Sequence, residues 1–419
     1  MKYKIPKYKN KICLLLINSF LILFTRFYNF CNISIYLFEK IILKQIFYKK
    51  NFSILNICNK TTIINGKNHR VEALNKGKKY LNKCLKGILT NKHIKYFNNN
   101  CTILTVIIPI FNCEKTIKAT IRSIQNQNFL DIEIILVNDF SKDNSLKIIE
   151  KFKKEDLRIK IVNNNKNMGT LYSRCIGALL SQGEYIFALD NDDMFFDDDV
   201  FEFIYKNAKN GNFDIIGFKS IFIDNIYNFD IKQMKDGPLP IHSNNLIILQ
   251  PELGVSSISK LGEVRDINIW GKCIKNKIYV KGINFLGIKR YSIFMSWAED
   301  TSMVFIIFNI AKSYKYVNKY GIIHFNDLKT ASYTQPDSNK LFGLLFLLDI
   351  IFDFSKNNTN KNSAVYFALN NIKLIEEEKN ILFFKYILKK IMKCKYITKS
   401  NKRKLKDNFL NFLYKKYKN

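Results

Sequence analysis

The middle of the chain alternates between short apolar runs and segments in which apolar residues recur every three to four positions. The apolar runs are rich in β-branched or aromatic residues and predict strands at 104–110, 132–137, 159–162 and 185–189. The segments between them predict helices at 115–125, 144–154 and 170–180. Strands and helices that alternate in this way predict an α/β fold, with a mainly parallel sheet and helices on both faces.

The chain before this region has a different pattern. Residues 1–47 begin with a head of five lysines, and positions 12–25 form a 14-residue run with only three polar residues. A basic head before an apolar run is typical of a membrane anchor, although about 20 apolar residues are needed to span a bilayer. A helix that lies on a membrane or packs on the globular part is the alternative. Residues 48–101, rich in Lys and Asn, predict a stem or linker.

The chain after the alternating region is also distinct. Residues 333–419 show helical periodicity and carry many lysines, so we expect an appended helical, basic C-terminal region. A solvated basic surface is the simplest interpretation of that region. The strand-and-helix domain is therefore expected at 102–332.

Composition narrows the class of protein. The chain has 419 residues, with 67 Lys and Arg against 35 Asp and Glu, and its formal net charge is +32. Hydrophobic residues make up 47% of the chain, which is incompatible with global disorder. The basic residues are scattered and match no nucleic-acid module, so we expect no nucleic-acid partner. Nine dispersed cysteines without a CxxC pair, and four dispersed histidines, do not form a zinc framework.

Polar residues gather where three of the predicted strands end. The first strand runs into 109–112 (PIFN), the second into 138–145 (NDFSKDNS) and the fourth into 190–193 (DNDD). In such sheets ligands bind at the carboxyl ends of the strands, so these residues are expected to converge on one crevice. Two carboxylates of an Asp-x-Asp turn suit the hard-oxygen preference of Mg²⁺ or Mn²⁺, although so short a motif also occurs by chance. The acidic run 197–199 is interpreted as the cap of the next helix.

Four segments in order and in register carry a resemblance to a known family. They are 105–112 (TVIIPIFN), 134–145 (IILVNDFSKDNS), 167–174 (NMGTLYSR) and 183–193 (GEYIFALDNDD). Together they resemble the family-2 glycosyltransferases over roughly 102–332, and four motifs in register are far more specific than one. The resemblance implies a GT-A fold, an inverting reaction, a nucleotide-sugar donor and a divalent cation, Mn²⁺ or Mg²⁺.

The resemblance also implies which residues bind the donor. It assigns Pro109, Phe111 and Asp139 to the nucleotide base, because an aromatic ring can stack on a base and a carboxylate can accept a base N–H. It places Arg174 near the nucleotide, with a surface ion pair as the alternative. This chain has Asn138 where the family often has Asp, and Phe where Gly is common at position 140, so the turn geometry and base preference are open.

The remaining assignments concern the metal and the chemistry. The resemblance makes Asp192 the direct metal ligand and gives Asp190 a contact to ribose or to metal-bound water. The pair Glu299 and Asp300, which opens an apolar helical run at 302–311, matches the family's acidic pair, and Asp300 is the candidate general base. Helix capping is the alternative for that pair.

We therefore expect an inverting glycosyltransferase with metal assistance, acting on a saccharide, protein or lipid-linked acceptor hydroxyl. Two alternatives stay open. One is a polyprenyl-phosphate sugar transferase of the same fold, and the other is a catalytically inactive sugar- or nucleotide-binding scaffold. The N-terminal segment leads us to expect membrane association, as a single-pass protein of the secretory pathway (ER or Golgi) or, alternatively, as a cytoplasmic peripheral membrane protein.

Overall fold

The computed structural model describes residues 55–89, 103–223, 234–236, 247–249, 268–295 and 298–325, with a few single positions from 343 to 403. Side chains are described from residue 70 onward. The chain divides into two compact units, Met1–Val71 and Glu72–Asn419. The anchor-like segment 1–47 and most of 333–419 lie outside the described residues. None of the helices within the described ranges combines the length and the apolar character that a membrane crossing needs.

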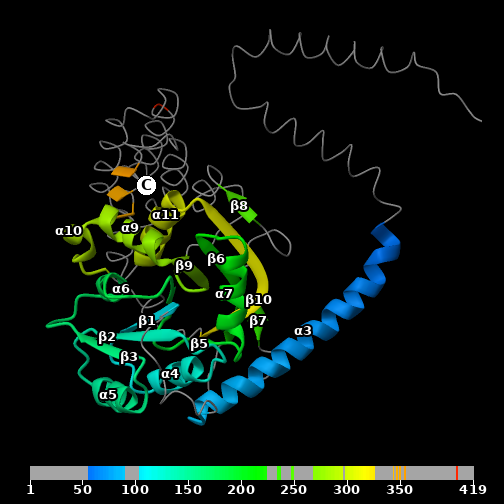
Figure 1. Cartoon of the computed structure of the whole chain (residues 1–419), viewed down its shortest axis with the longest axis horizontal. Coiled ribbons are helices and arrows are strands. Elements are labelled where there is room, and N and C mark those ends of the chain that lie inside the picture. The colour runs from blue at the N-terminus through cyan, green and yellow to red at the C-terminus, as the bar shows by residue number, and fades with distance from the viewer. Residues whose placement is uncertain are drawn as a thin grey trace, which may run out of the picture. The chain divides into compact units, whose positions relative to one another are not determined.

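A ten-stranded sheet forms the centre of the second unit (Figure 1). Its main path runs β3-β2-β1-β4-β9-β6-β10-β5, with β7 beside β6 and β8 beside β10. The strands are β1 (Leu104–Ile110), β2 (Ile132–Asn138), β3 (Ile159–Asn163), β4 (Tyr185–Ala188), β5 (Met194–Phe195), β6 (Ile215–Ile223), β7 (Lys235–Asp236), β8 (Ile247–Leu249), β9 (Lys272–Lys275) and β10 (Ser313–Phe325). The first four strands of this path, β3, β2, β1 and β4, match the strands that the apolar runs predict, to within one residue at each end.

Parallel and antiparallel pairings divide the sheet. Strands β3, β2, β1 and β4 pair in parallel, as do β6 and β10. Strand β9 lies between β4 and β6 and is antiparallel to both. The sheet is therefore mixed, and the parallel pairings among β1, β2, β3 and β4 are those that the strand-helix alternation predicts.

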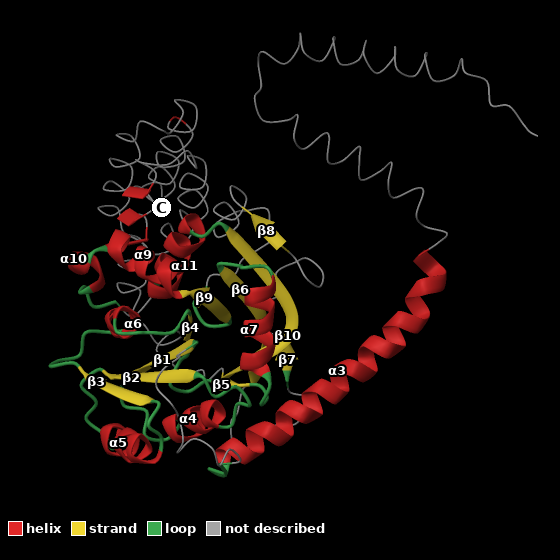
Figure 2. Cartoon of the chain, in the orientation of Figure 1, coloured by secondary structure: helices red, strands yellow, loops and turns green. Residues whose placement is uncertain are grey.

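Helices cover both faces of the sheet (Figure 2). Helices α6, α9 and α11 pack on one face, around residues such as Ile107 of β1. Helices α4, α5 and α7 pack on the other, around its neighbours Val106 and Ile108. This alternation follows from the pleat of a strand, which points successive side chains to opposite faces. The helices are α3 (Leu55–Leu85), α4 (Ile117–Gln125), α5 (Ser145–Glu155), α6 (Thr170–Leu179), α7 (Val200–Asn210), α9 (Asn276–Leu286), α10 (Ile288–Tyr291) and α11 (Glu299–Ile310).

The region expected to be a stem contains helix α3. From Glu72 onward this helix is part of the same compact unit as the sheet, and Leu74 and Leu81 are buried in an apolar cluster with Phe196. A Cβ at Gly77 would lie 2.3 Å from the Phe196 ring, so the close approach requires glycine. The end of α3 is thus integrated into the core of the domain.

A few described residues of the C-terminal region are helical and also join the core. Phe354 packs edge-on against Phe285 and Phe305, with ring centroids 5.0 and 5.7 Å away. Phe346, Leu347 and Ile350 are buried in the same cluster. The division of the chain at 47, 101 and 332 remains a prediction.

Candidate functional site

The residues Asp190–Asp193 form a tight turn between β4 and β5, which we call the acid turn. The backbone N–H of Asp193 donates to the carbonyl of Asp190 at 3.2 Å. The side-chain amide of Asn191 donates to the carbonyl of Pro109 at 3.0 Å, and the Thr120 hydroxyl donates to the carbonyl of Asn191 at 2.9 Å. These bonds fix the acid turn to the end of β1 and to helix α4.

Arg174 joins the acid turn to the start of helix α11. It lies on α6, only 4% of its surface is exposed, and its guanidinium donates to the carboxylates of Asp190 and Asp300. The second oxygen of Asp300 accepts the backbone N–H of Ile269 at 3.3 Å. The structure therefore brings two of the candidate carboxylates, one from the acid turn and one from α11, onto the buried guanidinium of a third candidate residue.

Negative charge is crowded around this guanidinium. Burial raises the pKa of Asp300, and the charge of Arg174 acts against that rise. Burial and the neighbouring Asp300 raise the pKa of Glu299 to about 7. On the acid turn, burial and the carboxylates of Asp193 and Asp190 raise the pKa of Asp192 to about 7. Ionising all of these carboxyl groups at once is therefore unfavourable in this site.

The fourth residue of the acid turn has a cationic partner that the sequence motifs do not include. His324 of β10 places Nδ1 2.9 Å from the carboxylate of Asp193, which is fully buried. Burial would lower the pKa of His324, but the Asp193 carboxylate raises it to about 9, which favours the charged form of the ring. It stacks on Trp270, with ring centroids 4.8 Å apart and planes at 9°.

Asp139, the candidate base-binding carboxylate, is held inside the protein. It is 3% exposed and accepts the side-chain amide of Asn164 and the backbone N–H groups of Met168 and Gly169, all at 2.7–2.8 Å. A carboxylate has about four lone-pair positions, so about one remains for a ligand. The immediate role of Asp139 is to fasten the end of β2 to the loop before α6.

The loops after β1 and β2 interlock beside it. The Asn112 side chain accepts the backbone N–H of Lys142 at 2.8 Å, and the backbone N–H of Asn112 donates to the Ser141 hydroxyl at 3.2 Å. The backbone φ angles of Asn112 and Phe140 are positive, 47° and 63°, which residues other than glycine rarely adopt. Phe111 projects here with 43% of its surface exposed.

The hydrogen bonds of Asn138 explain why an amide stands where the family often has Asp. Its side-chain amide donates to the Asn163 side chain at 2.9 Å and accepts the backbone N–H of Ser141 at 3.2 Å. A carboxylate could make only the second of these bonds, because it has no N–H to donate. The amide thus connects β2, β3 and the following turn.

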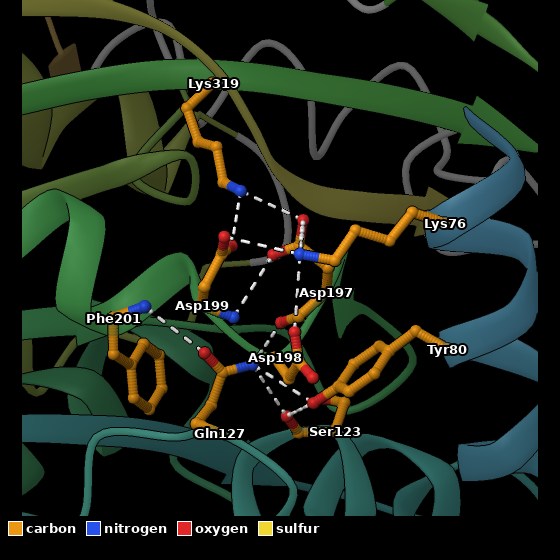
Figure 3. Close-up of polar contacts among 9 residues, drawn as sticks. All are labelled: Lys76, Tyr80, Ser123, Gln127, Asp197, Asp198, Asp199, Phe201 and Lys319. Atoms are coloured by element: carbon orange, nitrogen blue, oxygen red, sulfur yellow. Dashed lines mark hydrogen bonds and ion pairs between the residues drawn. The ribbon is translucent and has the colours of Figure 1, made fainter. Parts of the chain in front are cut away.

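A second acidic cluster begins at Asp197, four residues after the end of the acid turn at Asp193. Asp197–Asp199, which we call the acidic clip, has carboxylate oxygens within 4.8 Å of one another. Lys76 of α3 lies 3.3–3.5 Å from all three carboxylates, and Lys319 of β10 pairs with Asp197 at 2.9 Å and with Asp199 (Figure 3). Two ammonium groups occupy the position that a cation would take, so this cluster is a structural contact.

The polar groups beneath the acidic clip are also satisfied. The Gln127 side-chain amide donates to the carbonyls of Asp197 and Ser123 at 2.5 and 3.2 Å and to the Tyr80 hydroxyl at 3.1 Å (Figure 3). Its oxygen accepts the backbone N–H of Phe201 at 3.2 Å. Helix α3 is therefore bound to the segment that leads out of the acid turn.

Residues 105–257 match the family described as Glycosyl transferase family 2. A cholesterol galactosyltransferase of Borreliella burgdorferi is 30% identical over 231 residues, which cover 55% of this chain and 62% of that protein. A GalNAc(5)-diNAcBac-PP-undecaprenol beta-1,3-glucosyltransferase of Campylobacter jejuni is 38% identical over 91 residues, which cover 22% of this chain and 29% of that protein. The chain thus spans less than two thirds of these relatives.

The fold has solved counterparts. The crystal structure of S. aureus TarS 1-349 in complex with UDP-GlcNAc matches with a TM-score of 0.53 at 14% identity, covering 69% of this chain and 79% of that chain. At this identity the match establishes the GT-A fold, which agrees with the mixed sheet and its two helical layers.

Proposed function

Because this chain carries a domain of glycosyltransferase family 2, we propose that it transfers a sugar from a nucleotide-diphosphate donor to an acceptor hydroxyl, with inversion at the sugar carbon. The observation that supports this most directly is the Arg174 bridge. It connects Asp190, on the turn assigned to the donor, with Asp300, the candidate base. The two halves of a displacement reaction are thus held side by side.

The acid turn fits a divalent cation. Asp193 is engaged by His324 and one Asp190 oxygen by Arg174, so Asp192 and the second oxygen of Asp190 are the hard oxygen donors, with Asp192 the proposed direct ligand. The raised pKa of Asp192 reflects the crowding of carboxylates, which a bound Mn²⁺ or Mg²⁺ would relieve. When bound, the cation offsets the negative charge of the diphosphate leaving group.

Charge balance supports metal assistance independently. A nucleotide diphosphate is an anion, and it would enter a site in which negative groups outnumber positive ones. Repulsion would oppose donor binding unless a cation came with the donor. The carboxyl groups that interact here are Asp190, Asp192, Asp193, Glu299 and Asp300, and the cationic side chains among them are Arg174, His324 and Lys272.

Asp300 is proposed as the general base. As the acceptor oxygen forms its bond to C1, the C1–O bond to the diphosphate breaks with its electron pair, and Asp300 takes the hydroxyl proton. Burial raises the pKa of Asp300 and makes the carboxylate more basic, whereas Arg174 acts against that rise and orients the carboxylate. Glu299, one residue earlier, lines the same helix start.

Pro109, Phe111 and Asp139 are proposed to form the nucleotide side of the site. The exposed ring of Phe111 is available for stacking on a base, and Asp139 positions the loop that leads into α6. Arg174 on that helix would then be placed to attract the negatively charged diphosphate. The donor therefore contacts residues whose positions depend on one another.

The acceptor is proposed to be a hydroxyl on a lipid or on a lipid-linked sugar. Relatives of this chain carry names with cholesterol and undecaprenol acceptors. The open alternatives are a polyprenyl phosphate as direct acceptor and an inactive scaffold. Product analysis separates the first, because mild acid releases the transferred sugar as a monosaccharide when it is attached directly to phosphate, and as part of a longer saccharide when it is attached to a lipid-linked sugar.

The decisive experiment compares Asp300→Asn with the unchanged protein. Transfer from a panel of nucleotide-sugars to lipid-linked acceptors, in Mn²⁺ or Mg²⁺, is followed by mass spectrometry. We expect Asp300→Asn to lower transfer by roughly 10²- to 10⁴-fold, as for loss of a general base. Thermal stabilisation by the nucleoside diphosphate with Mn²⁺ should persist in that variant.

Asp198→Asn on the acidic clip is the matched control, since it makes the same chemical change and should leave transfer intact. Full transfer by Asp300→Asn would remove Asp300 from the mechanism. Absence of turnover with every donor, despite nucleotide binding, would favour the scaffold.

A further inference from the structure

The segment 287–295, which we call the α10 loop, presents apolar side chains to solvent. It contains helix α10, and Ile288, Ile293 and Phe294 are 66%, 37% and 54% exposed. Tyr291 and Met295 in the same segment are buried. Singly exposed apolar residues are ordinary, but three within seven consecutive positions form a local apolar surface that calls for an explanation.

The α10 loop is firmly held by its buried and charged residues. Tyr291 packs against Tyr172 of α6, with ring centroids 6.0 Å apart. Arg290 pairs with Asp349 at 2.9 Å and with Asp353. The loop thus has an anchored inner side, and its outward apolar side chains have a defined position.

The surroundings of the α10 loop are basic. Residues 276–295 contain four basic residues and no acidic one. Lys277, Lys281 and Lys289 are exposed, and within the described part of the chain no ion pair involves them. Apolar side chains beside unpaired lysines are typical of protein surfaces that enter the headgroup layer of a membrane.

We propose that the α10 loop binds the surface of an anionic bilayer, with Ile288, Ile293 and Phe294 inserted among the headgroups. The lysines around it would be attracted to anionic lipids, as would the chain's overall charge of +32. An apolar protein partner would gain nothing from a surface rich in unpaired lysines unless it were itself acidic. The combination of apolar and basic groups therefore favours lipid.

The position of the loop gives this contact a consequence, which rests on the proposed function. A Cβ at Gly169 would lie 3.2 Å from the Phe294 ring, and the N–H of Gly169 donates to Asp139. The loop leads within a few residues to Glu299 and Asp300. An acceptor that stays attached to its lipid in the bilayer would thus be presented beside the candidate base.

The test uses the full chain and compares two tryptophan substitutions. Ile288→Trp and Leu157→Trp change residues that are both 66% exposed, and Leu157 lies between α5 and β3, away from the α10 loop in sequence. The native Trp270 and Trp297 are common to both variants. Each variant is mixed with vesicles of phosphatidylcholine and phosphatidylglycerol that contain brominated acyl chains.

We expect extra quenching and a blue-shifted emission for Ile288→Trp, and neither change for Leu157→Trp. Both effects should weaken on pure phosphatidylcholine. Lys289→Gln should lower partitioning into anionic vesicles by roughly fivefold, the loss of one lysine near a charged surface. Vesicle binding without quenching of Ile288→Trp, or no vesicle binding at all, would overturn the proposal. Loss of the quenching when a soluble acidic protein competes with the vesicles would point to a protein partner instead.

A transfer assay separates this inference from the proposed function. Ile288→Ser with Ile293→Ser should leave donor hydrolysis unchanged and lower transfer to a vesicle-borne acceptor by tenfold or more, while Leu157→Ser should affect neither. If donor turnover is absent from every form but quenching is present, the proposed function fails and the membrane contact stands. If turnover is present and quenching is absent, the reverse holds.

Discussion

Two aspartate-rich turns, the acid turn Asp190–Asp193 and the acidic clip Asp197–Asp199, lie on either side of strand β5 and have opposite electrostatic states. Lys76 and Lys319 pair with the acidic clip. Burial would raise the pKa of Asp199, but its bonds to Asp197 and Lys319 lower it instead. On the acid turn, burial and neighbouring carboxylates raise the pKa of Asp192 to about 7. Similar composition thus produces a contact paired with lysines in one place and a crowded group of carboxyls, with a disfavoured charge at Asp192, in the other.

The difference shows that a cluster of carboxylates is not in itself a metal site. The geometric requirement for sharing an ion is met by the acidic clip, whose lysines already neutralise it. Among the residues that the structure describes, no ion pair involves Asp192, whereas Arg174 pairs with Asp190 and His324 with Asp193. We therefore propose that the distribution of cations around each turn decides which of the two can bind an ion.

The largest effect should come from Arg174→Met, which removes the buried cation between Asp190 and Asp300. Asp190 and Asp300 would be left as uncompensated carboxylates, and we expect the free energy of unfolding to fall by about 3–5 kcal/mol. Urea unfolding followed by circular dichroism measures this. Arg122→Met, which loses a partly exposed pair with Glu155, is the control and should cost at most about 1 kcal/mol. Equal losses in the two variants would show that Arg174 does not stabilise the carboxylates of Asp190 and Asp300 more than an ordinary surface ion pair would.

The next effect concerns the two lysines of the acidic clip. Lys319→Met leaves Asp197, 3% exposed, without its closest cation, and should lower the free energy of unfolding by about 2 kcal/mol. The Lys76 side chain is 50% exposed, so Lys76→Met should cost about 0.5 kcal/mol. Thermal and urea unfolding of both variants test this order, and a larger loss for Lys76→Met would reverse our view of which lysine sustains the clip.

A third, smaller effect distinguishes the two turns by ion binding. Mn²⁺ at ten times its dissociation constant should stabilise the unchanged protein by about 1.4 kcal/mol. Asp192→Asn should abolish this stabilisation, whereas Asp198→Asn on the acidic clip should retain it. The readout is the melting temperature with and without EDTA. Loss of the Mn²⁺ effect in Asp198→Asn, with retention in Asp192→Asn, would move the ion to the acidic clip.

The smallest effect is a pH dependence of the acidic clip. Burial raises the pKa of Asp197 to about 6, above the value of an unfolded Asp. A group whose pKa is raised on folding contributes stability below its unfolded pKa and loses that contribution as pH rises through the folded pKa. Relative to Asp197→Asn, the unchanged protein should therefore lose on the order of 1 kcal/mol between pH 5 and pH 7.5. Parallel stability curves for the two proteins would contradict this assignment.

Much of the parallel half of the sheet was predictable, because its strands are apolar runs separated by helices of clear periodicity. Strand β9 was not predictable, because lysines such as Lys272 and Lys275 are usually found at the protein surface. Each is buried with a specific partner: the Lys275 ammonium bonds Asn212 and Asp214, and that of Lys272 bonds the carbonyl of Asn268. Partners 4 to 63 residues away decide the state of such lysines, and no local pattern reports them.

The candidate site shows the same division. The motifs located Asp190, Asp192, Arg174 and Asp300, and the roles assigned to them remain predictions. The contact of His324 with Asp193 had no sequence signal beyond a lone histidine after a possible strand. The bond network of Asp139 was also hidden, because three donors from a loop 25 to 30 residues later compose it.

The sequence by itself determined the strand-helix order, the resemblance to a family and the acidic residues at the strand ends, because these depend on local periodicity and on motifs a few residues long. Only the tertiary structure decided which carboxylate meets which cation. Arg174 reaches across 126 residues to Asp300, and Lys319 reaches across more than 100 residues to the acidic clip. Coulombic interactions depend on distance and burial in space, and the order of residues along the chain does not specify either.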